Sequence, residues 1–209
     1  MNYQDYSRAV LIDLPWLEFN LPRHGRVLDA GCGTGWAIRS LEGKGLRTIG
    51  LDLQRTTSNS VHGTVASLPF RSQSFDVVVC VRTLHHVEEE PRVLREFARV
   101  LRPTGFLLVS VANRWSYTLL QLRVGSSRWM PNPAQPRYRL YSSTELVHLL
   151  EAEGFVVIGI RTCHFVPQWL GRNPDGTYLP FFVKADPSLG LNPITARFGP
   201  LWVACGRKQ

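Results

Sequence analysis

Several patterns are scarce or absent in this chain of 209 residues, and each absence narrows the class of protein. No apolar run approaches the roughly 20 residues that a membrane-spanning helix needs, so we expect no membrane span. The first residues, MNYQDYSRAV, lack a basic segment followed by an apolar one, which argues against an export signal. These two absences favour a cytoplasmic location.

Cysteine is scarce, and no CxxC pair occurs among the four cysteines, which are Cys32, Cys80, Cys163 and Cys205. Their spacing is neither that of a disulfide framework nor that of a structural zinc site, so we expect no metal. The last three fall in apolar runs that are typical of buried strands. We therefore expect reduced, inert thiols.

Lysine is also rare, because only three of the 24 basic residues are lysines and the others are arginines. With 16 acidic residues the net charge is +8. This bias reflects either overall composition or arginines that serve phosphate or carboxylate partners. The hydrophobic content of 44% with 19% charged residues is that of a globular chain, and we expect residues 1–209 to form one domain.

Apolar runs alternate with helix-like segments along the chain. Six runs are typical of buried strands, and they cover residues 26–31, 46–51, 75–81, 106–112, 155–165 and 200–206. Helices are expected over 34–43, from Pro91 to a stop at Pro103 and Gly105, and from Ser142 or Ser143 to Glu153. This alternation predicts an α/β protein with a doubly wound, mostly parallel sheet. The last two strands have no helix between them, which predicts an antiparallel pair.

The turn after the first expected strand is rich in glycine. Gly31, Gly33 and Gly35 alternate there, Asp29 precedes them, and Asp52 follows at the end of the second strand. In a doubly wound sheet, ligands bind at this end of the strands, where glycine allows close approach to the backbone. A carboxylate at the position of Asp52 can accept hydrogen bonds from both hydroxyls of a ribose. Glycine also occurs in ordinary turns, but these features together favour a nucleoside-binding site.

Dinucleotide binding is the main alternative for this turn. Its pattern is G-x-G-x-x-G, in which the turn must hold a pyrophosphate. Here the spacing is G-x-G-x-G, and Trp36 would obstruct a pyrophosphate at that position. The pattern therefore favours a ligand without a pyrophosphate.

Six segments together resemble the S-adenosylmethionine (SAM)-dependent methyltransferases of the type 11, or UbiE-like, group. They are VLDAGCGTG at 27–35, IGLDLQ at 49–54, SLPF at 67–70, SFDVVVC at 74–80, TLHHVEE at 83–89 and LREFARVLRPTGFLLVSV at 94–111. The resemblance is close over residues 24–112 and weaker beyond, where YSSTELVHLLEAEGF at 141–155 still fits. It implies a seven-stranded Rossmann-like methyltransferase fold with an antiparallel last strand. It also implies SAM as cofactor and S-adenosyl-L-homocysteine as product.

The same resemblance implies roles for individual residues. Many relatives carry an Asp where this chain has Thr64, so a side-chain carboxylate contact with adenine is missing, and backbone groups near Val65 and Ala66 become the alternative. Arg82 would face the methyl-donor end of the pocket. The other residues implied to bind the cofactor are Asp29, Gly31, Cys32 and Gly33 around the methionine part, Asp52 at the ribose and Leu53 beside the adenine.

Two adjacent histidines, His85 and His86, follow the fourth strand of the resemblance, where the acceptor pocket of the family opens. A base is needed only if the acceptor must lose a proton, and a histidine suits that task. In other proteins of this pattern, one histidine merely packs or binds the backbone. His85 and His86 are therefore candidate catalytic residues.

Residues 113–141 contain five arginines and no acidic residue, and aromatic side chains lie among them. Three interpretations remain for this segment: a lid over a small or lipid-like acceptor, an RNA-contacting patch, or a surface that docks a protein. Its RYRLYSSTEL run is faintly similar to tRNA wobble-uridine methyltransferases. A second segment, 166–198, is expected to complete the acceptor wall. A SAM-binding module without catalysis is a further alternative.

Overall fold

The computed structural model describes residues 24–35, 38, 41–42, 45–54, 58–116, 139–163, 199 and 201–209, with the side chain of Cys163 left out. Trp36, most of the expected helix at 34–43, the end of the strand expected at 155–165 and the bulk of the segments 113–141 and 166–198 lie outside these residues. The described part contains the whole glycine-rich turn and every candidate site residue.

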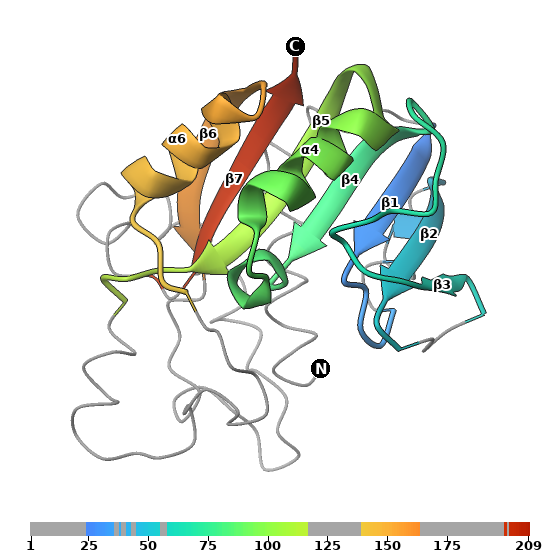
Figure 1. Ribbon diagram of the computed structural model, residues 1–209, viewed down its shortest axis with the longest axis horizontal. Helices are drawn as coiled ribbons and strands as arrows, with labels where there is room; N and C mark the ends of the chain where they lie inside the picture. Colours follow the sequence, from blue (N-terminus) through green and yellow to red (C-terminus); the bar gives the residue numbers. More distant parts are fainter. Residues whose placement is uncertain are drawn as a thin grey trace.

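A seven-stranded sheet forms the centre of the molecule (Figure 1). Its strands are β1 (Arg26–Ala30), β2 (Arg47–Asp52), β3 (Ser60–His62), β4 (Phe75–Val81), β5 (Leu101–Ala112), β6 (Phe155–Cys163) and β7 (Leu201–Lys208). They lie in the order β3-β2-β1-β4-β5-β7-β6. The first five are parallel, and β7 pairs antiparallel with both β5 and β6. The expected mostly parallel sheet with an antiparallel last strand is thus confirmed.

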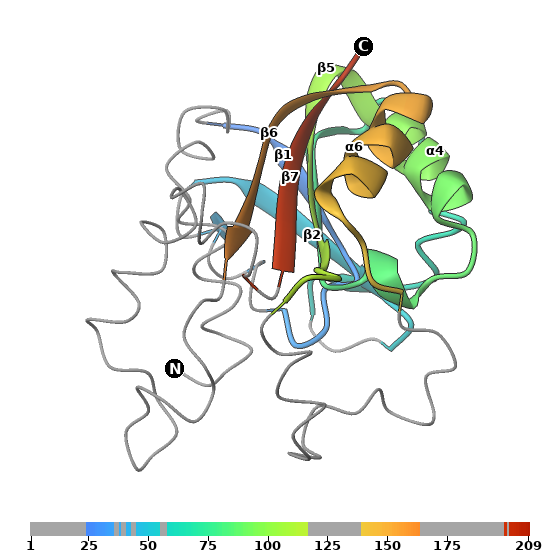
Figure 2. The ribbon, with the colours of Figure 1, turned by 90° about the vertical axis from the view of Figure 1, so that its left-hand side faces the viewer.

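Two helices, α4 (Glu90–Val100) and α6 (Ser143–Ala152), cover one face of this sheet (Figure 2). Leu94 and Phe97 of α4 are fully buried in the core, together with Leu146 of α6. Such burial follows from their helical spacing, which places apolar side chains on one side. The start of α6 is a capping box in which Ser142 and Glu145 satisfy each other's backbone N–H groups. Of the two serines expected to start this helix, Ser142 is therefore the N-cap.

The boundary between α4 and β5 differs from the expectation that Pro103 and Gly105 stop the helix. The helix already ends at Val100, and Leu101 is extended and pairs with Phe75. Gly105 instead lies within β5, where the missing side chain lets its backbone approach β4 closely. An added Cβ would lie 3.0 Å from the carbonyl oxygen of Asp76. The expectation was wrong because strand pairing with β4 begins before the proline, and a local stop signal does not reveal this.

The described cysteine side chains, those of Cys32, Cys80 and Cys205, are buried and free. Burial raises the pKa of the Cys80 and Cys205 thiols to about 12, and the nearby charge of Asp29 adds to the effect at Cys80. These thiols stay protonated at neutral pH, as expected for inert structural cysteines. Within the described part of the chain, no helix is long and apolar enough to cross a membrane.

Candidate functional site

The loop at residues 31–35, called the glycine loop below, is a tight turn after β1. Gly31, Gly33 and Gly35 have φ angles of 79°, 50° and 74°. At Gly31 a side chain is excluded both by this left-handed backbone and by space, because an added Cβ would lie 2.1 Å from Oγ1 of Thr83. The glycine loop therefore packs directly against the residues that follow β4.

Protein acceptors engage the first N–H groups of the glycine loop. Those of Gly31 and Cys32 donate to the Leu51 carbonyl at 2.7 and 3.1 Å. That of Gly33 donates to Oδ2 of Asp52 at 2.8 Å. A pyrophosphate would need such N–H groups for itself, so the loop does not suit the dinucleotide alternative. Its carbonyl oxygens and the Asp52 carboxylate suit a ligand rich in ammonium and hydroxyl donors.

Asp52 and Leu53 end β2 beside this loop. Besides the bond from Gly33, Asp52 accepts the Gln54 N–H on Oδ1 at 3.2 Å. A carboxylate has about four acceptor positions, and within the described part of the chain two of those of Asp52 are left for ligand hydroxyls. The Leu53 side chain is 71% exposed, although it is large and apolar. This pair offers acceptors for a ribose and an apolar surface for a flat ring.

Asp29 and Cys32, also expected at the cofactor site, lie deeper. Asp29 is 2% exposed within β1, where it is in register with Gly50 of β2 and Val79 of β4. Cys32 is fully buried and packs close to Gly50. Asp29 therefore supports the glycine loop from within β1, whereas Cys32 belongs to the loop and packs it against β2.

The loop after β3 carries Thr64 in place of the acid found in many relatives. Thr64 Oγ1 accepts the Ala66 N–H at 3.3 Å, and the Thr64 carbonyl accepts the Ser67 N–H at 3.2 Å. The Leu68 N–H donates to Glu96 at 2.7 Å. Among the described residues, the Val65 N–H has no acceptor. The Val65 N–H thus stays available to a ligand, whereas the Ala66 N–H is already engaged by Thr64.

The loop after β4 contains the other candidate residues. Arg82 has a φ of 55°, an uncommon conformation for a residue other than glycine, and its N–H donates to Ser110 Oγ at 3.0 Å. A 3₁₀ turn follows at Leu84–His86, called the histidine turn below. Strain of this kind, held in place by neighbouring strands, is typical of functional sites.

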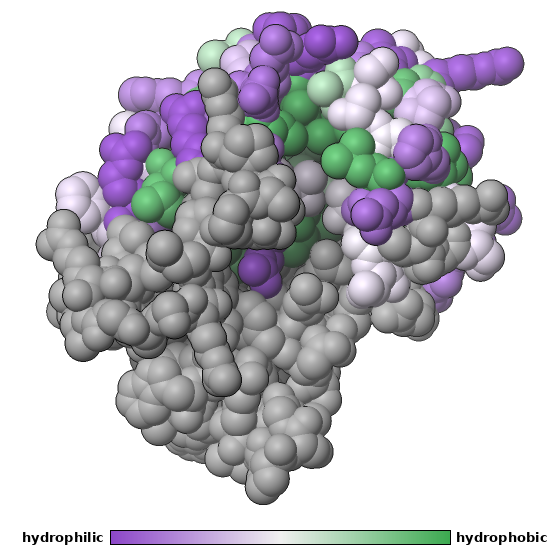
Figure 3. Space-filling model, turned by 60° about the horizontal axis from the view of Figure 1, so that its bottom comes forward, coloured by the Kyte–Doolittle hydropathy of each residue, from purple (hydrophilic) through white to green (hydrophobic). Residues whose placement is uncertain are grey.

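The loops after β1, β2 and β4 meet at the carboxyl-terminal edge of the parallel strands (Figure 1). Figure 3 brings this edge forward and shows apolar side chains of the described residues bordered by polar ones. Thr83 joins two of the loops, because its Oγ1 lies 3.5 Å from the Gly31 carbonyl. The structure thus brings the expected cofactor residues and the candidate catalytic histidines to one edge.

His85 is 1% exposed, and its ring centroid lies 4.2 Å from that of His86. Burial lowers the pKa of His85 well below its ordinary value of 6.5, and the neighbouring His86 and Arg82 lower it further. The imidazole is therefore neutral at physiological pH, which is the form that a base requires.

The buried His85 should make folding stability depend on pH. Since its pKa is lowered in the folded state, the unfolded chain binds the proton more readily, and stability decreases as the pH falls below about 6.5. The slope contributed by His85 should approach about 1.4 kcal/mol per pH unit. We expect His85→Gln to flatten this slope in urea unfolding between pH 6.5 and 5.

The matched control is His148→Gln, at an exposed position of α6, which should keep the wild-type slope. The measurement stays above pH 5 because Glu96 and Glu145, with pKa values below 4.5, begin to take up protons at lower pH. An unchanged slope in His85→Gln would contradict a buried neutral imidazole.

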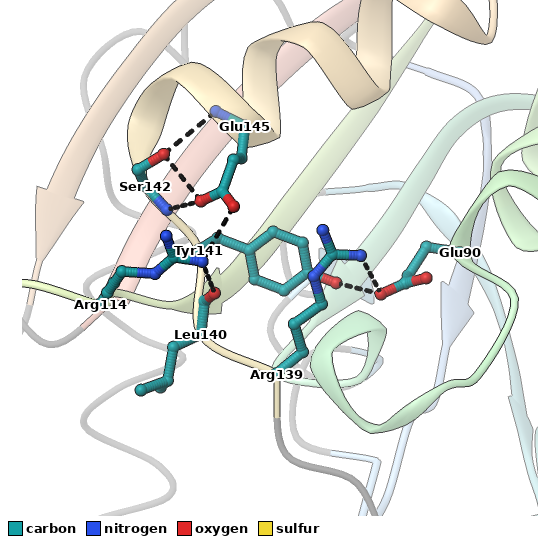
Figure 4. Close-up of polar contacts among 7 residues, drawn as sticks. All are labelled: Glu90, Arg114, Arg139, Leu140, Tyr141, Ser142 and Glu145. Carbon is teal, nitrogen blue, oxygen red and sulfur yellow. Dashed lines mark hydrogen bonds and ion pairs between the residues drawn. The ribbon is translucent and has the colours of Figure 1, made fainter.

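A group of contacts beside the histidine turn was not expected from the sequence (Figure 4). Glu90 accepts hydrogen bonds from Tyr141 and Arg139, at 2.8 and 2.9 Å. From sequence alone, Glu90 is a helix-starting residue, and Arg139 and Tyr141 belong to an inserted segment. No local signal could have paired them, because 49 and 51 residues separate them from Glu90.

A cavity of about 890 Å³ lies elsewhere, beside β2 and β3. Thr48 and Ser60 are among its lining residues, but Gly31, Asp52 and His85 are not. The connection between the parallel strands β2 and β3, residues 53–59, has only seven residues. It is too short to contain a crossover helix that would cover the sheet beside this cavity. This cavity is therefore separate from the candidate site.

Comparison with known proteins gives a match to the family described as "Methyltransferase domain" over residues 3–160. The chain is 26% identical over 183 residues to a ubiquinone biosynthesis O-methyltransferase of Aeromonas salmonicida, covering 77% of each protein. It is 34% identical over 142 residues to a probable S-adenosylmethionine-dependent methyltransferase of Mycolicibacterium smegmatis, covering 63% of this chain and 52% of that protein.

A solved structure with a similar fold is the Burkholderia thailandensis 1,6-didemethyltoxoflavin-N1-methyltransferase, which contains bound 1,6-didemethyltoxoflavin and S-adenosylhomocysteine. The TM-score is 0.64 at 22% identity, covering 98% of this chain and 78% of that one. This similarity supports the fold assigned from the strand order.

Proposed function

Because the chain belongs to the methyltransferase domain family and uses S-adenosylmethionine as methyl donor, we propose that it methylates an oxygen, nitrogen or carbon nucleophile of a small or lipid-like acceptor. The observation that carries the proposal is the contact between the glycine loop and the loop after β4. Thr83 Oγ1 lies 3.5 Å from the Gly31 carbonyl, so the two loops, one for the donor and one for the acceptor, share an edge.

The described residues fit the cofactor. Asp52 would hold the ribose, and Leu53 with the Val65 N–H would flank and bind the adenine. The glycine loop, with carbonyl oxygens and few free N–H groups, would accept from the ammonium of the methionine part. Arg82 would face the methyl-donor end. When bound, the sulfonium supplies a methyl group already activated for displacement.

The protein's own task is then to align the acceptor and to keep water away. Alignment of this kind accounts for a large share of the acceleration in such displacements. His85 and His86 follow β4, on the acceptor side of the site. Either would remove a proton from an acceptor that must lose one. His85 is neutral, as a base requires, but its lowered pKa makes it a weaker base than an ordinary imidazole.

A small acceptor is favoured over RNA by the described arginines of the basic segment. Arg114 donates to Glu145 at 2.8 Å, and Arg139 donates to Glu90 at 2.9 Å. Two of the five arginines in residues 113–141 are therefore paired within the protein and are less available to phosphates. The printed names of two similar proteins, which concern ubiquinone biosynthesis and toxoflavin, also agree with a small acceptor. We place the protein in the cytoplasm.

The test is transfer of labelled methyl from S-adenosylmethionine to three acceptor sets: phenols and quinols, small amines, and total tRNA. We expect label in a small acceptor. With a hydroxyl acceptor, His85→Asn or His86→Asn should lower kcat by about 10²-fold or more, as expected for loss of a base.

Two controls accompany this assay. Cofactor affinity, measured by calorimetry with S-adenosylhomocysteine, should stay within a few-fold of wild type in both variants. Label found only in tRNA, with binding that weakens steeply with salt, would overturn the small-acceptor proposal and favour the RNA alternative.

A further inference from the structure

The segment Arg139–Tyr141 connects two parts of the acceptor side. Its backbone extends the sheet at the end of β5, where the Tyr141 N–H donates to the Ala112 carbonyl and the Arg114 N–H donates to the Tyr141 carbonyl, both at 2.9 Å. At its other end, the Arg139 N–H donates to the carbonyl of His85 at 3.0 Å. A single stretch of chain thus links β5 to the histidine turn.

Side chains reinforce this link at Glu90 (Figure 4). Tyr141 is fully buried, and its hydroxyl donates to Oε1 of Glu90 at 2.8 Å. Arg139 donates to the same oxygen at 2.9 Å, and its guanidinium lies 4.8 Å from the centroid of the Tyr141 ring. Glu90, with 8% of its side chain exposed, is the first residue of α4 and lies four residues beyond the histidine turn.

Glu90 is ionised at neutral pH. Burial alone would raise its pKa, but hydrogen bonds from its own N–H, Tyr141 and Arg139 hold the pKa below its ordinary value. The ion pair of Glu90 with Arg139 is only partly buried, because the Arg139 side chain is 49% exposed, and such pairs add little net stability. A role in fixing geometry therefore explains this carboxylate better than a role in stability.

We propose that Glu90 is a positioning residue, which holds the histidine turn at a fixed place between the end of β5 and the glycine loop through Tyr141 and Arg139. On the far side, the turn is fixed by Thr83, whose Oγ1 contacts Gly31. In this proposal Glu90 acts through its bonds to Tyr141 and Arg139, and no contact with donor or acceptor is assigned to it. Its effect on methyl transfer rests on the proposed function, whereas its effect on the turn does not.

The experiment compares wild type with Glu90→Gln and Tyr141→Phe by amide hydrogen exchange, without any acceptor. The His86 N–H, which donates to Thr83, and the Arg139 N–H report on the turn. We expect exchange at both to rise by about tenfold or more in Glu90→Gln, and less in Tyr141→Phe, which keeps the ion pair. Amides of β1 and β4 should keep their wild-type rates.

The matched control is Glu153→Gln. Glu153 pairs with Arg95 at 3.2 Å between α4 and α6, away from the histidine turn. This variant should leave exchange at His86 and Arg139 unchanged. If Glu90→Gln raises exchange equally throughout the sheet, or not at all at the turn, the positioning role is wrong. If Glu90→Gln does not fold, Tyr141→Phe decides on the smaller effect: a rise in exchange confined to His86 and Arg139 supports the positioning role, and unchanged exchange at both contradicts it.

Catalysis supplies a second readout, with catechol as the probe acceptor. Glu90→Gln should lower kcat by about tenfold while the affinity for S-adenosylhomocysteine stays within about threefold. Exchange that changes as expected, while wild type transfers no methyl group to catechol or to any small acceptor of the preceding assay, would leave the positioning role standing and contradict the proposed acceptor class. Equal loss of cofactor affinity and kcat would overturn the positioning role.

Discussion

Replacing Asp52 with alanine should weaken the binding of S-adenosylmethionine and S-adenosylhomocysteine by about 100-fold or more. Hydrogen bonds to a charged group contribute about 1.5–3 kcal/mol each, and a ribose would form two with this carboxylate. Asp52 also accepts the Gly33 N–H at 2.8 Å, so the substitution removes a ligand contact and loosens the glycine loop at once. Calorimetry with both ligands measures the effect.

Two further variants separate these causes. Asp52→Asn keeps one acceptor oxygen and should fall between wild type and alanine. Asp76→Asn is the matched control, because Asp76 also accepts a backbone N–H, that of Arg26 at 2.8 Å, but lies at the start of β4. It should bind both ligands as wild type does. Unchanged affinity in Asp52→Ala, with the sheet folded, would show that the ribose lies elsewhere.

Replacing Gly31 with alanine should be the most damaging single change in the described site. The new Cβ would lie 2.1 Å from Oγ1 and 2.8 Å from Cβ of Thr83, and the φ of 79° adds backbone strain. Crowding and strain each cost about 1–3 kcal/mol, which together approach a large part of the stability of a small domain. Urea unfolding should show this loss, and cofactor binding should be abolished.

Gly159→Ala is the matched control, because the added Cβ at that position of β6 meets no described residue within 4 Å apart from its chain neighbours. It should change stability by less than about 1 kcal/mol. The double variant Gly31→Ala with Thr83→Ala should recover only part of the loss, since the Thr83 Cβ and the φ strain remain. If Gly31→Ala is as stable as Gly159→Ala, the two loops are not held in contact.

Local sequence patterns predicted much of the fold. The apolar runs predicted six of the seven strands, all but the short β3, because strand periodicity appears within a few residues. Leu94 and Phe97 lie at helical spacing on the buried side of α4 for the same reason. The capping box of Ser142 and Glu145 is local too, since its partners are three residues apart. Element boundaries that depend on strand pairing were less predictable from the sequence. For example, β5 begins at Leu101 because this residue pairs with Phe75 of β4.

The position of the last strand shows the same limit. An antiparallel pair of closing strands was predicted from the missing helix between them. The structure places β7 between β5 and β6, with β6 at the edge of the sheet. This order is decided by which strands pair through their backbone hydrogen bonds. The sequence of β7 does not indicate which strands it pairs with.

The glycine loop and Asp52 were determined by the sequence, because a turn that approaches a ligand closely needs glycine at fixed positions and a carboxylate at the next strand end. Only the tertiary structure decided that Gly31 packs on Thr83 and that Glu90 joins Tyr141. Contacts between polar side chains some 50 residues apart have no period along the chain. They arise only when the sheet brings the ends of β1, β4 and β5 to one edge, because parallel strands place their carboxyl ends together.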